Sequence, residues 1–386
     1  MRHFDNLDVM ERERLFLHEP EAFDRDSPSD TLAVALGATL YVPASRPDLA
    51  VDIEKLRRQG AVSVVLCLED AITDDSVLFS EQNVISELRK YAQTGAVGPL
   101  IFVRVRSPHQ IPLVVKGLDE QVSVLSGFVL PKFTEDTGTP FVEQVETVSR
   151  ETGHHLYIMP VLESEEVMFI ESRAETLTSI KELLDKHRSR VLAVRIGATD
   201  LCAAFGVRRP RDLTIYDVHL VAGVISDVVN ILGRANHHGF TVTGPVWEYF
   251  NAGERRLKPQ LRETPFVEND ERAVRVQLLA NDLDGLIREV MLDQANGLTG
   301  KTVIHPSHLS AVHAMSVVTD EEYQDACDVL GSELSSGGVN RSAYRNKMNE
   351  GRPHRAWAER VSLRAKIFGV ARPEISFADL LAASIR

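Results

Sequence analysis

The chain has 386 residues, with 43 Lys and Arg against 56 Asp and Glu, and therefore a formal charge of −13 at pH 7. Hydrophobic residues make up 44% and charged residues 26%, which excludes a disordered or fibrous composition. A protein this acidic is a poor general binder of nucleic acid, because the phosphates repel it. No apolar run is long enough to cross a bilayer, and the first residues lack a signal-peptide core. We therefore expect neither nucleic acid nor a membrane as a partner.

The three cysteines (Cys67, Cys202 and Cys327) are far apart in the sequence. They form no C-x-x-C pair and no metal-ligand spacing, so a disulfide framework is excluded. We expect a protein of the reducing cytoplasm.

Short runs rich in β-branched and other apolar residues recur from residue 39 onward. They are 39–42, 62–68, 100–105, 127–131, 156–162, 191–196, 240–244 and 301–304. Most are apolar throughout, which is typical of parallel strands covered on both faces. Amphipathic segments such as 45–60, 82–95 and 215–239 separate them and indicate helices. The alternation predicts an α/β fold of the (β/α)8 TIM-barrel type.

We divide the chain into an N-terminal extension (1–38), a barrel domain (39–310) and a C-terminal helical, basic appendage (311–386). The connection after the seventh run (247–272) is long and polar, which indicates an insertion. Between residues 341 and 372, nine Lys and Arg face two acids, a local charge of +7. This basic tail is either a solvated helical face or a flap for an anionic substrate or a neighbouring subunit.

Charged side chains follow nearly every predicted strand, at the end where a barrel of this type carries its chemistry. In chain order they are Arg46, Glu69 with Asp70, Arg104 with Arg106, Lys132, Glu163, Asp200 and His305. Any one of them can be a helix cap or a solvated loop charge. Taken together, they predict a ring of carboxylates and cations around one mouth of the barrel.

The residue types in this ring indicate a chemistry. Glu163 and Asp200, from neighbouring strands, suit Mg²⁺, which prefers a few carboxylates together with water and substrate oxygens. Arg46 and Arg104 can clamp a substrate carboxylate in bidentate fashion. Lys132 can form a Schiff base only if its pKa is lowered, and Glu135 and Asp136 close by favour an electrostatic role instead. Glycine-rich phosphate loops and a G-x-S-x-G elbow do not occur in the sequence.

Seven motifs of the chain, in consistent order over residues 39 to 330, carry a resemblance to a known family. They are YVPASRPDL, VLCLEDAI, FVRVRS, FVLPKF, MPVLESEEVM, IGATDLCAAFG and GKTVIHPSHL. With them the sequence resembles the HpcH/HpaI aldolase and citrate lyase β-subunit family. The basic tail (344–370) looks like a branch associated with tellurium-resistance gene clusters.

The resemblance implies a barrel that holds Mg²⁺ through Glu163 and Asp200. It implies that Arg104 binds the carboxylate of a 2-oxo acid and that Glu69 and Asp70 support the metal. Arg106 stands where the family usually has Asn, so the substrate of this chain is left open. Family members recruit a carboxylate from a neighbouring subunit, which implies a homo-oligomer.

We therefore expect a Mg²⁺-dependent carbon–carbon lyase or aldolase that is similar to citrate lyase. Its substrate is a small 2-oxo or 2-hydroxy acid or an acyl thioester of one, including a CoA ester. Arg104, Glu69 and Asp70 are the expected catalytic residues, and Arg46 and Lys132 bind substrate together with Arg104. Two alternatives stay open: a barrel that handles enolates of the phosphoenolpyruvate type, and a catalytically silent protein that binds a metabolite.

Overall fold

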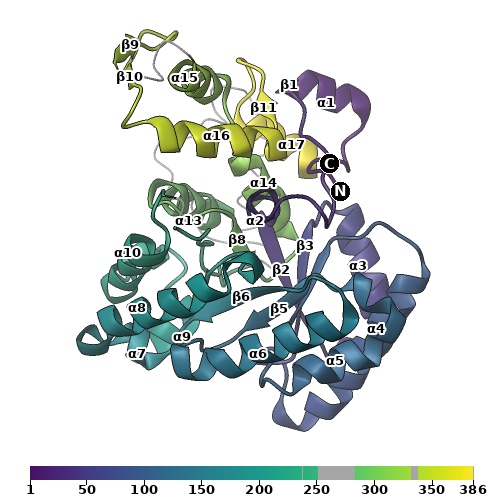
Figure 1. Cartoon of the computed structure of the whole chain (residues 1–386). Coiled ribbons are helices and arrows are strands. Elements are labelled where there is room, and N and C mark those ends of the chain that lie inside the picture. Colours follow the sequence, from purple (N-terminus) through teal and green to yellow (C-terminus); the bar gives the residue numbers. More distant parts are fainter. Residues whose placement is uncertain (237, 251–282, 332–337, 386) are drawn as a thin grey trace.

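A curled parallel sheet forms the centre of the molecule (Figure 1). The computed structural model describes residues 1–236, 238–250, 283–331 and 338–385. The strands of the sheet are β2 (Ala38–Pro43), β3 (Ser63–Cys67), β4 (Leu100–Arg104), β5 (Gly127–Leu130), β6 (Tyr157–Leu162), β7 (Arg195–Ile196) and β8 (Lys301–Val303). They are hydrogen-bonded in the order β7-β6-β5-β4-β3-β2-β8, which is chain order with β8 joined to β2.

The gap between β7 and β8 is closed by the run 240–244. Val194 and Val242 form one parallel bridge, and Gly244 and Lys301 form another. We expected a strand here, but the segment makes only these isolated bridges. It ends at Pro245, which has no N–H to continue a ladder. With this segment the strands surround a common interior, and the predicted (β/α)8 TIM barrel is confirmed.

Helices surround the sheet, as the amphipathic segments predicted (Figure 1). They are α3 (Leu49–Arg58), α4 (Val77–Gln93), α5 (Gln110–Leu118), α6 (Glu135–Thr152), α7 (Glu165–Met168), α8 (Ile170–Lys186), α9 (Ala198–Ala203), α10 (His219–Leu232), α13 (Leu283–Ala295) and α14 (Ser307–Ser316). Short 3-10 turns lie at η1 (Asp74–Ser76), η2 (Asp119–Val124), η3 (Arg188–Arg190) and η4 (Ile215–Asp217). Local chemistry sets the ends of α6, since Thr134 and Thr137 form a capping box and Gly153 follows at a φ of 72°.

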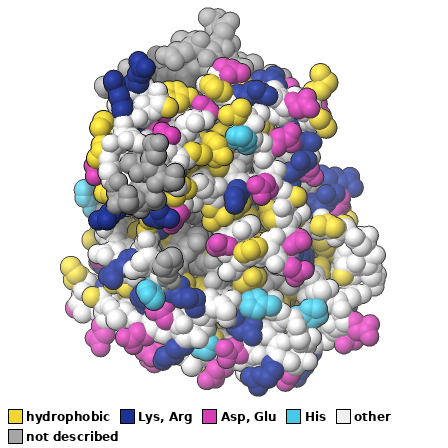
Figure 2. All heavy atoms as spheres, turned by 45° about the horizontal axis from the view of Figure 1, so that its top comes forward, with side chains coloured by type: hydrophobic (Ala, Val, Ile, Leu, Met, Phe, Trp, Pro, Cys, Tyr) yellow, Lys and Arg dark blue, Asp and Glu magenta, His cyan; other side chains and the backbone are white. Residues whose placement is uncertain are grey.

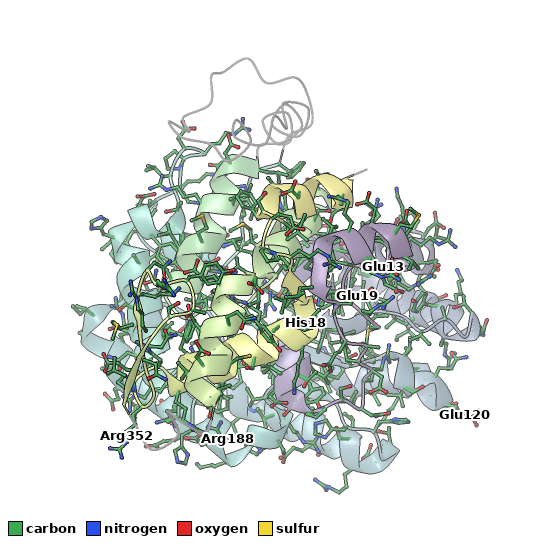
Figure 3. All side chains as sticks on the ribbon, turned by 90° about the horizontal axis from the view of Figure 1, so that it is seen from above. Glu13, His18, Glu19, Glu120, Arg188 and Arg352 are labelled. Atoms are coloured by element: carbon green, nitrogen blue, oxygen red, sulfur yellow. The ribbon has the colours of Figure 1, made fainter. Side chains whose placement is uncertain are left out.

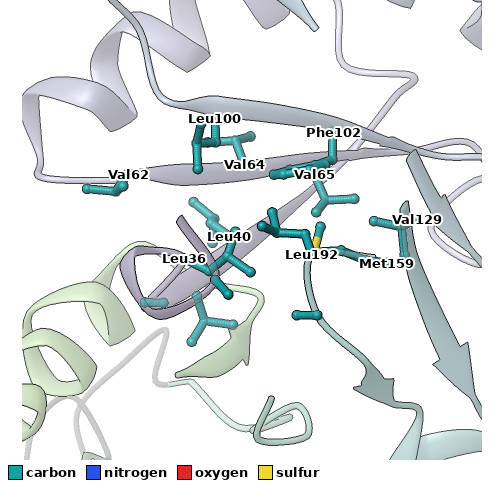
Figure 4. Close-up of a cluster of buried hydrophobic side chains, with 14 of the residues drawn as sticks. Leu36, Leu40, Val62, Val64, Val65, Leu100, Phe102, Val129, Met159 and Leu192 are labelled. Carbon is teal, nitrogen blue, oxygen red and sulfur yellow. The ribbon is translucent and has the colours of Figure 1, made fainter. Parts of the chain in front are cut away.

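The core consists of the apolar strand residues predicted from the sequence (Figure 4). Val64, Val65, Phe102 and Val129 have no measurable exposure. Burying side chains of this size stabilises the fold by roughly 1.5–3 kcal/mol each relative to leaving them exposed. The strands are therefore covered on both faces, which is why their sequences do not alternate.

The two ends of the chain pack together at one end of the barrel (Figure 1). The elements of this layer are α1 (Val9–Leu15), β1 (Phe16–His18), α2 (Ser29–Ala35), α15 (Asp320–Leu330), β9 (Val339–Arg341), β10 (Met348–Glu350), α16 (Arg355–Phe368), β11 (Val370–Ala371) and α17 (Phe377–Ile385). β1 pairs antiparallel with β11, and the His18 ring lies 5.0 Å from the ring of Tyr323 in α15 (Figure 3). The domain boundaries that we drew from the sequence stay predictions.

This layer covers the end of the barrel where the strands begin. α2 leads directly into the start of β2 and contacts α16. Arg360 of α16 donates to the carbonyl of Gly233, which follows α10 and precedes the seventh run. The C-terminal appendage therefore lies at the end of its own barrel opposite to the strand ends that carry the predicted site.

The cations of the basic tail are largely used within the chain. Lys347 pairs with Glu321 and Asp325 at 2.7 Å, and Arg364 pairs with Glu322 at 2.7 Å. Figure 2 shows Lys and Arg side chains interleaved with Asp and Glu on the face that includes this layer. These pairs favour the interpretation of the tail as a solvated face. The insertion predicted at 247–272 lies mostly outside the described residues.

Candidate functional site

One guanidinium group joins three carboxylates at the carboxyl ends of the strands. Nη2 of Arg104, the last residue of β4, lies 2.6 Å from Oε2 of Glu69 and 2.8 Å from Oε1 of Glu163. It also lies 3.3 Å from Oδ2 of Asp70. Glu69 and Asp70 follow β3, and Glu163 follows β6, so two loops and the end of β4 deliver these side chains to one place. Parallel strands all end at the same edge, which is why the charges converge.

Lys132 adds a second cation to the cluster. Its Nζ lies 3.3 Å from Oε1 of Glu69, and its backbone N–H donates to Oε1 of Glu163 at 3.0 Å. The residue has a φ of 46°, in the left-handed region that costs a non-glycine residue energy. Burial opposes the charge on Lys132, but Glu69, Asp70 and Asp200 outweigh it and raise the pKa of the amine. A raised pKa favours the electrostatic role over Schiff-base formation.

Glu163 and Asp200 repel each other across the site. Burial raises the pKa of Glu163 to about 7; Arg104 opposes the rise and the charge of Asp200 adds to it. Burial, and then the charge of Asp70, also raise the pKa of Asp200. A hydrogen bond between the two side chains opposes this rise. Two neighbouring carboxyl groups with raised pKa values favour the binding of either a proton or a metal cation.

A glycine provides the space for the Glu163 side chain. Gly197 lies at the end of β7, in the IGATD motif that also supplies Asp200. A Cβ placed on Gly197 would overlap the Oε2 and Cβ atoms of Glu163. The motif therefore serves both acids: it carries one and makes space for the other.

Arg46 and Arg106, which also follow predicted strands, lie outside this cluster. Nε of Arg46 pairs with Asp52 at 2.6 Å, and the Arg46 side chain is 55% exposed. The structure therefore does not bring Arg46 to the other site residues. Arg106 pairs with Asp74 and donates to the carbonyl of Glu69 at 3.3 Å, so it supports the loop that carries Glu69. His305 stacks on Phe250, with ring centroids 4.8 Å apart.

Sequence reasoning missed two polar residues beneath the cluster. Tyr41 of β2 and Arg195 of β7 point into the barrel, with the Arg195 Cζ 5.5 Å from the centre of the Tyr41 ring. The only signal in the sequence is an arginine inside the otherwise apolar run 191–196. A charged residue within a buried strand was the observation that could have found it.

The residues present fit a magnesium ion. In the described part of the chain, no group of three or more His, Cys, Asp and Glu is arranged to hold a metal. Mg²⁺ does not require such a cage, since it is usually held by one or two carboxylates with waters and substrate oxygens. Glu163 and Asp200 supply that donor set, and their raised pKa values indicate a place where a cation would relieve repulsion.

A TIM barrel with acids and an arginine gathered at the carboxyl-terminal mouth defines an enzyme of the barrel class. A family model described as C–C bond lyase of the TIM-barrel fold matches residues 30–370. The chain therefore belongs to this family and is a carbon–carbon lyase. The predicted resemblance to the citrate lyase β-subunit group is confirmed at this level.

Solved structures share the fold at low sequence identity. A citrate lyase from Burkholderia xenovorans LB400 has a TM-score of 0.60 and 17% identity, covering 90% of this chain and 96% of that one. CitE from Mycobacterium tuberculosis, in complex with magnesium, acetoacetate and coenzyme A, has a TM-score of 0.52 and 20% identity, covering 86% and 99%. Malate synthase from Haloferax volcanii has a TM-score of 0.50 and 14% identity, covering 75% and 76%. No curated protein matches the sequence. Among the described residues, no helix is long and apolar enough to cross a bilayer.

Proposed function

We propose that this lyase is Mg²⁺-dependent and acts on a small 2-oxo or 2-hydroxy acid or its acyl thioester. The observation that carries the proposal is the pairing of Arg104 with Glu163 at 2.8 Å beside Asp200. Two acids that repel each other stand next to a buried cation that suits a carboxylate. Such a site holds a metal and an anionic substrate side by side. The magnesium and acetoacetate bound by the fold relative CitE support this choice.

In this proposal, Glu163 and Asp200 hold the metal. A Mg²⁺ ion held there would supply Lewis-acid stabilisation of negative charge that develops on a substrate oxygen. Arg104 binds the substrate carboxylate, with two parallel N–H donors that fix its orientation. Glu69 and Asp70 hold Arg104 in place, at 2.6 and 3.3 Å from its Nη2 atom. Lys132 contributes positive charge near Glu69 and keeps the mouth attractive to anions.

The chain supports two further proposals about its setting. We propose a homo-oligomer, because the appendage of each chain lies away from its own mouth. We propose a cytoplasmic location, because the three cysteines are free and Cys327 is exposed. Coenzyme A remains a candidate for the thioester group, and CitE binds it.

The proposal is tested by a turnover screen of 2-hydroxy acids, 2-oxo acids and their CoA thioesters, with Mg²⁺ and with EDTA. We expect cleavage to a carbonyl product that EDTA abolishes and Mg²⁺ restores. Asp200→Asn serves as the metal-site variant, and Glu182→Gln, an exposed acid on α8, serves as its matched control. Binding of a 2-oxo acid without any turnover would favour the silent binding protein. Turnover at the same rate with and without EDTA would contradict the proposal that the reaction depends on a metal.

A further inference from the structure

Within the part of the chain that the structure describes, one buried arginine inside the barrel has no acidic partner. Arg195 is 1% exposed and reaches three other strands: Nη1 lies 3.8 Å from the sulfur of Met159, Nη2 donates to Oγ1 of Thr302, and Cζ lies 5.5 Å from the Tyr41 ring centre. Because these strands surround the barrel, a side chain that touches all three lies in its interior. Its Nε atom is buried without a hydrogen-bond partner.

Burying a charged arginine without a counter-ion is energetically unfavourable. Burial lowers the pKa of Arg195, and the charge of Arg104 nearby lowers it further. Among the described residues Arg195 forms no ion pair, although buried charges in proteins are nearly always paired. Burying a charge without a partner costs several kcal/mol, more than a core position otherwise tolerates. The interior position therefore needs an explanation beyond packing.

Tyr41 connects this arginine to the site. Thr302 pairs with Thr39, and Tyr41 lies two residues further along β2 on the same face, so its side chain also points inward. Tyr41 keeps part of its surface exposed, whereas Arg195 is sealed. The charged and titratable groups around Tyr41 are Arg195, Arg104, Cys67 and Glu163. Burial raises the pKa of Tyr41, and the two arginines oppose that rise.

We propose that Tyr41 donates the proton to the enolate carbon and that Arg195 is the positioning residue that stabilises the phenolate left behind. The inference rests on the proposed lyase function. In the cleavage direction the carbon–carbon bond of the substrate breaks, and its electron pair forms the enolate. The proton of the substrate hydroxyl group passes to solvent, and the hydroxyl carbon becomes a carbonyl. The enolate carbon then takes the proton from Tyr41: the O–H bond breaks and a C–H bond forms. The charges of Arg195 and Arg104, which both oppose the rise of the Tyr41 pKa, stabilise the phenolate until water returns a proton.

The partial reaction can be tested without knowing the full substrate. Pyruvate is incubated with the full chain and Mg²⁺ in D₂O, and loss of its methyl protons is followed by NMR. We expect the parent to catalyse exchange and Tyr41→Phe to lose at least about a hundredfold, the usual contribution of a general acid or base. Arg195→Met should lose activity similarly, and adding it to Tyr41→Phe should cause no further loss. Tyr91→Phe, which removes a buried hydroxyl on α4, is the matched control.

A second readout does not depend on activity. The tyrosinate absorbance of the parent minus that of Tyr41→Phe reports the titration of Tyr41 alone. Arg195→Met should move this titration to higher pH, and Arg195→Lys should restore part of the shift because it keeps the charge. If Arg195→Met does not fold by circular dichroism, Arg195→Lys and Thr302→Val carry the same measurements. Thr302→Val removes the acceptor of Nη2 and leaves the charge.

The outcomes separate this inference from the proposed function. If Tyr41→Phe exchanges protons at the parental rate while Asp200→Asn does not, the inference is wrong and the metal-dependent lyase stands. Independent, multiplicative losses in the double variant overturn the role of Arg195. If the parent binds Mg²⁺ but exchanges no protons of pyruvate, the measurement is repeated with acetyl-CoA, and no exchange there either means that Tyr41 is not the proton donor. If the parent binds no Mg²⁺, the proposed function itself fails.

Discussion

Nη2 of Arg104 lies 2.8 Å from Oε1 of Glu163, so the predicted substrate arginine and a predicted metal ligand are each other's counter-ion. The contact neutralises a carboxyl group whose side chain is 1% exposed. A metal at Glu163 would compete with this contact, and a substrate carboxylate would then replace Glu163 as the partner of Arg104. We therefore expect metal and substrate to bind cooperatively. The metal frees Arg104 for the substrate carboxylate, and the substrate replaces the negative charge that Arg104 loses.

The metal pair gives the first prediction. Asp200→Asn and Glu163→Gln keep the side-chain size and remove one charge each, so both should abolish Mg²⁺ binding and leave the fold intact. For Asp200→Asn, removing a charge that repels Glu163 should not lower the free energy of unfolding. Glu163→Gln also removes a counter-ion of Arg104 and should cost some stability. Calorimetric titration with Mg²⁺, with and without pyruvate, measures the binding. Parental affinity in Asp200→Asn would show that this site has been assigned wrongly.

Gly197→Ala tests the space that Glu163 occupies. The added methyl group overlaps the Glu163 carboxyl group and forces it to move, because the neighbouring atoms belong to a buried side chain. We expect weaker Mg²⁺ binding and a loss of stability of roughly 1–3 kcal/mol from overpacking. Gly223→Ala is the matched control, because its φ is not positive and an added Cβ would meet only Nη1 of Arg173 at 3.9 Å. Unchanged metal affinity in Gly197→Ala would argue against Glu163 as a ligand.

The sequence predicted the barrel and most of the site because both follow from local patterns. Strands buried on both faces are apolar throughout, and parallel strands bring the residues after them to one edge, as with Glu69 and Glu163. The seventh run was predicted as a strand but forms only isolated bridges, since its hydrogen bonding depends on neighbours that are distant in sequence. Arg46 follows its strand by three residues, and its loop turns the side chain to Asp52. Arg195 was missed because burial of a charge inside a strand is a tertiary property.

A buried histidine predicts acid sensitivity. His313 accepts a hydrogen bond from the N–H of Ala38 at 3.3 Å, and burial lowers its pKa to about 4. Above the unfolded value near 6.5, both states are neutral and the stability is complete. As the pH falls from 6.5 to 4, only the unfolded chain takes up the proton, so stability declines by at most about 3 kcal/mol. Urea unfolding at several pH values should show this decline, and His313→Gln should flatten it. The same slope in both proteins would exclude His313 as the cause.

Arg104→Lys separates substrate binding from metal binding. An ammonium group cannot reproduce two parallel donors to a carboxylate, so the affinity for a 2-oxo acid should fall at least about tenfold. Mg²⁺ affinity should be retained, because the variant keeps the positive charge and leaves Glu163 and Asp200 unchanged. Calorimetry with each ligand alone and with both measures the two effects. Equal loss of metal and substrate affinity would mean that Arg104 supports the structure of the whole site.

The last prediction concerns the assembly. The appendage lies at the opposite end of its own barrel and leaves the mouth of that barrel uncovered. The helices that begin at the mouth expose apolar side chains there: Leu78 is 76% exposed and Phe79 57% at the start of α4, and Ile170 is 82% exposed at the start of α8. Burying such side chains against a second copy is favourable, at roughly 25 cal/mol per Å² of apolar surface. We expect a homo-oligomer by light scattering at micromolar concentration, and weaker association for Ile170→Glu than for Val97→Glu. Val97 is 72% exposed and lies beyond α4, near the start of β4 at the opposite end of the barrel. A monomeric parent would contradict the prediction, and equal effects of the two variants would place the interface elsewhere.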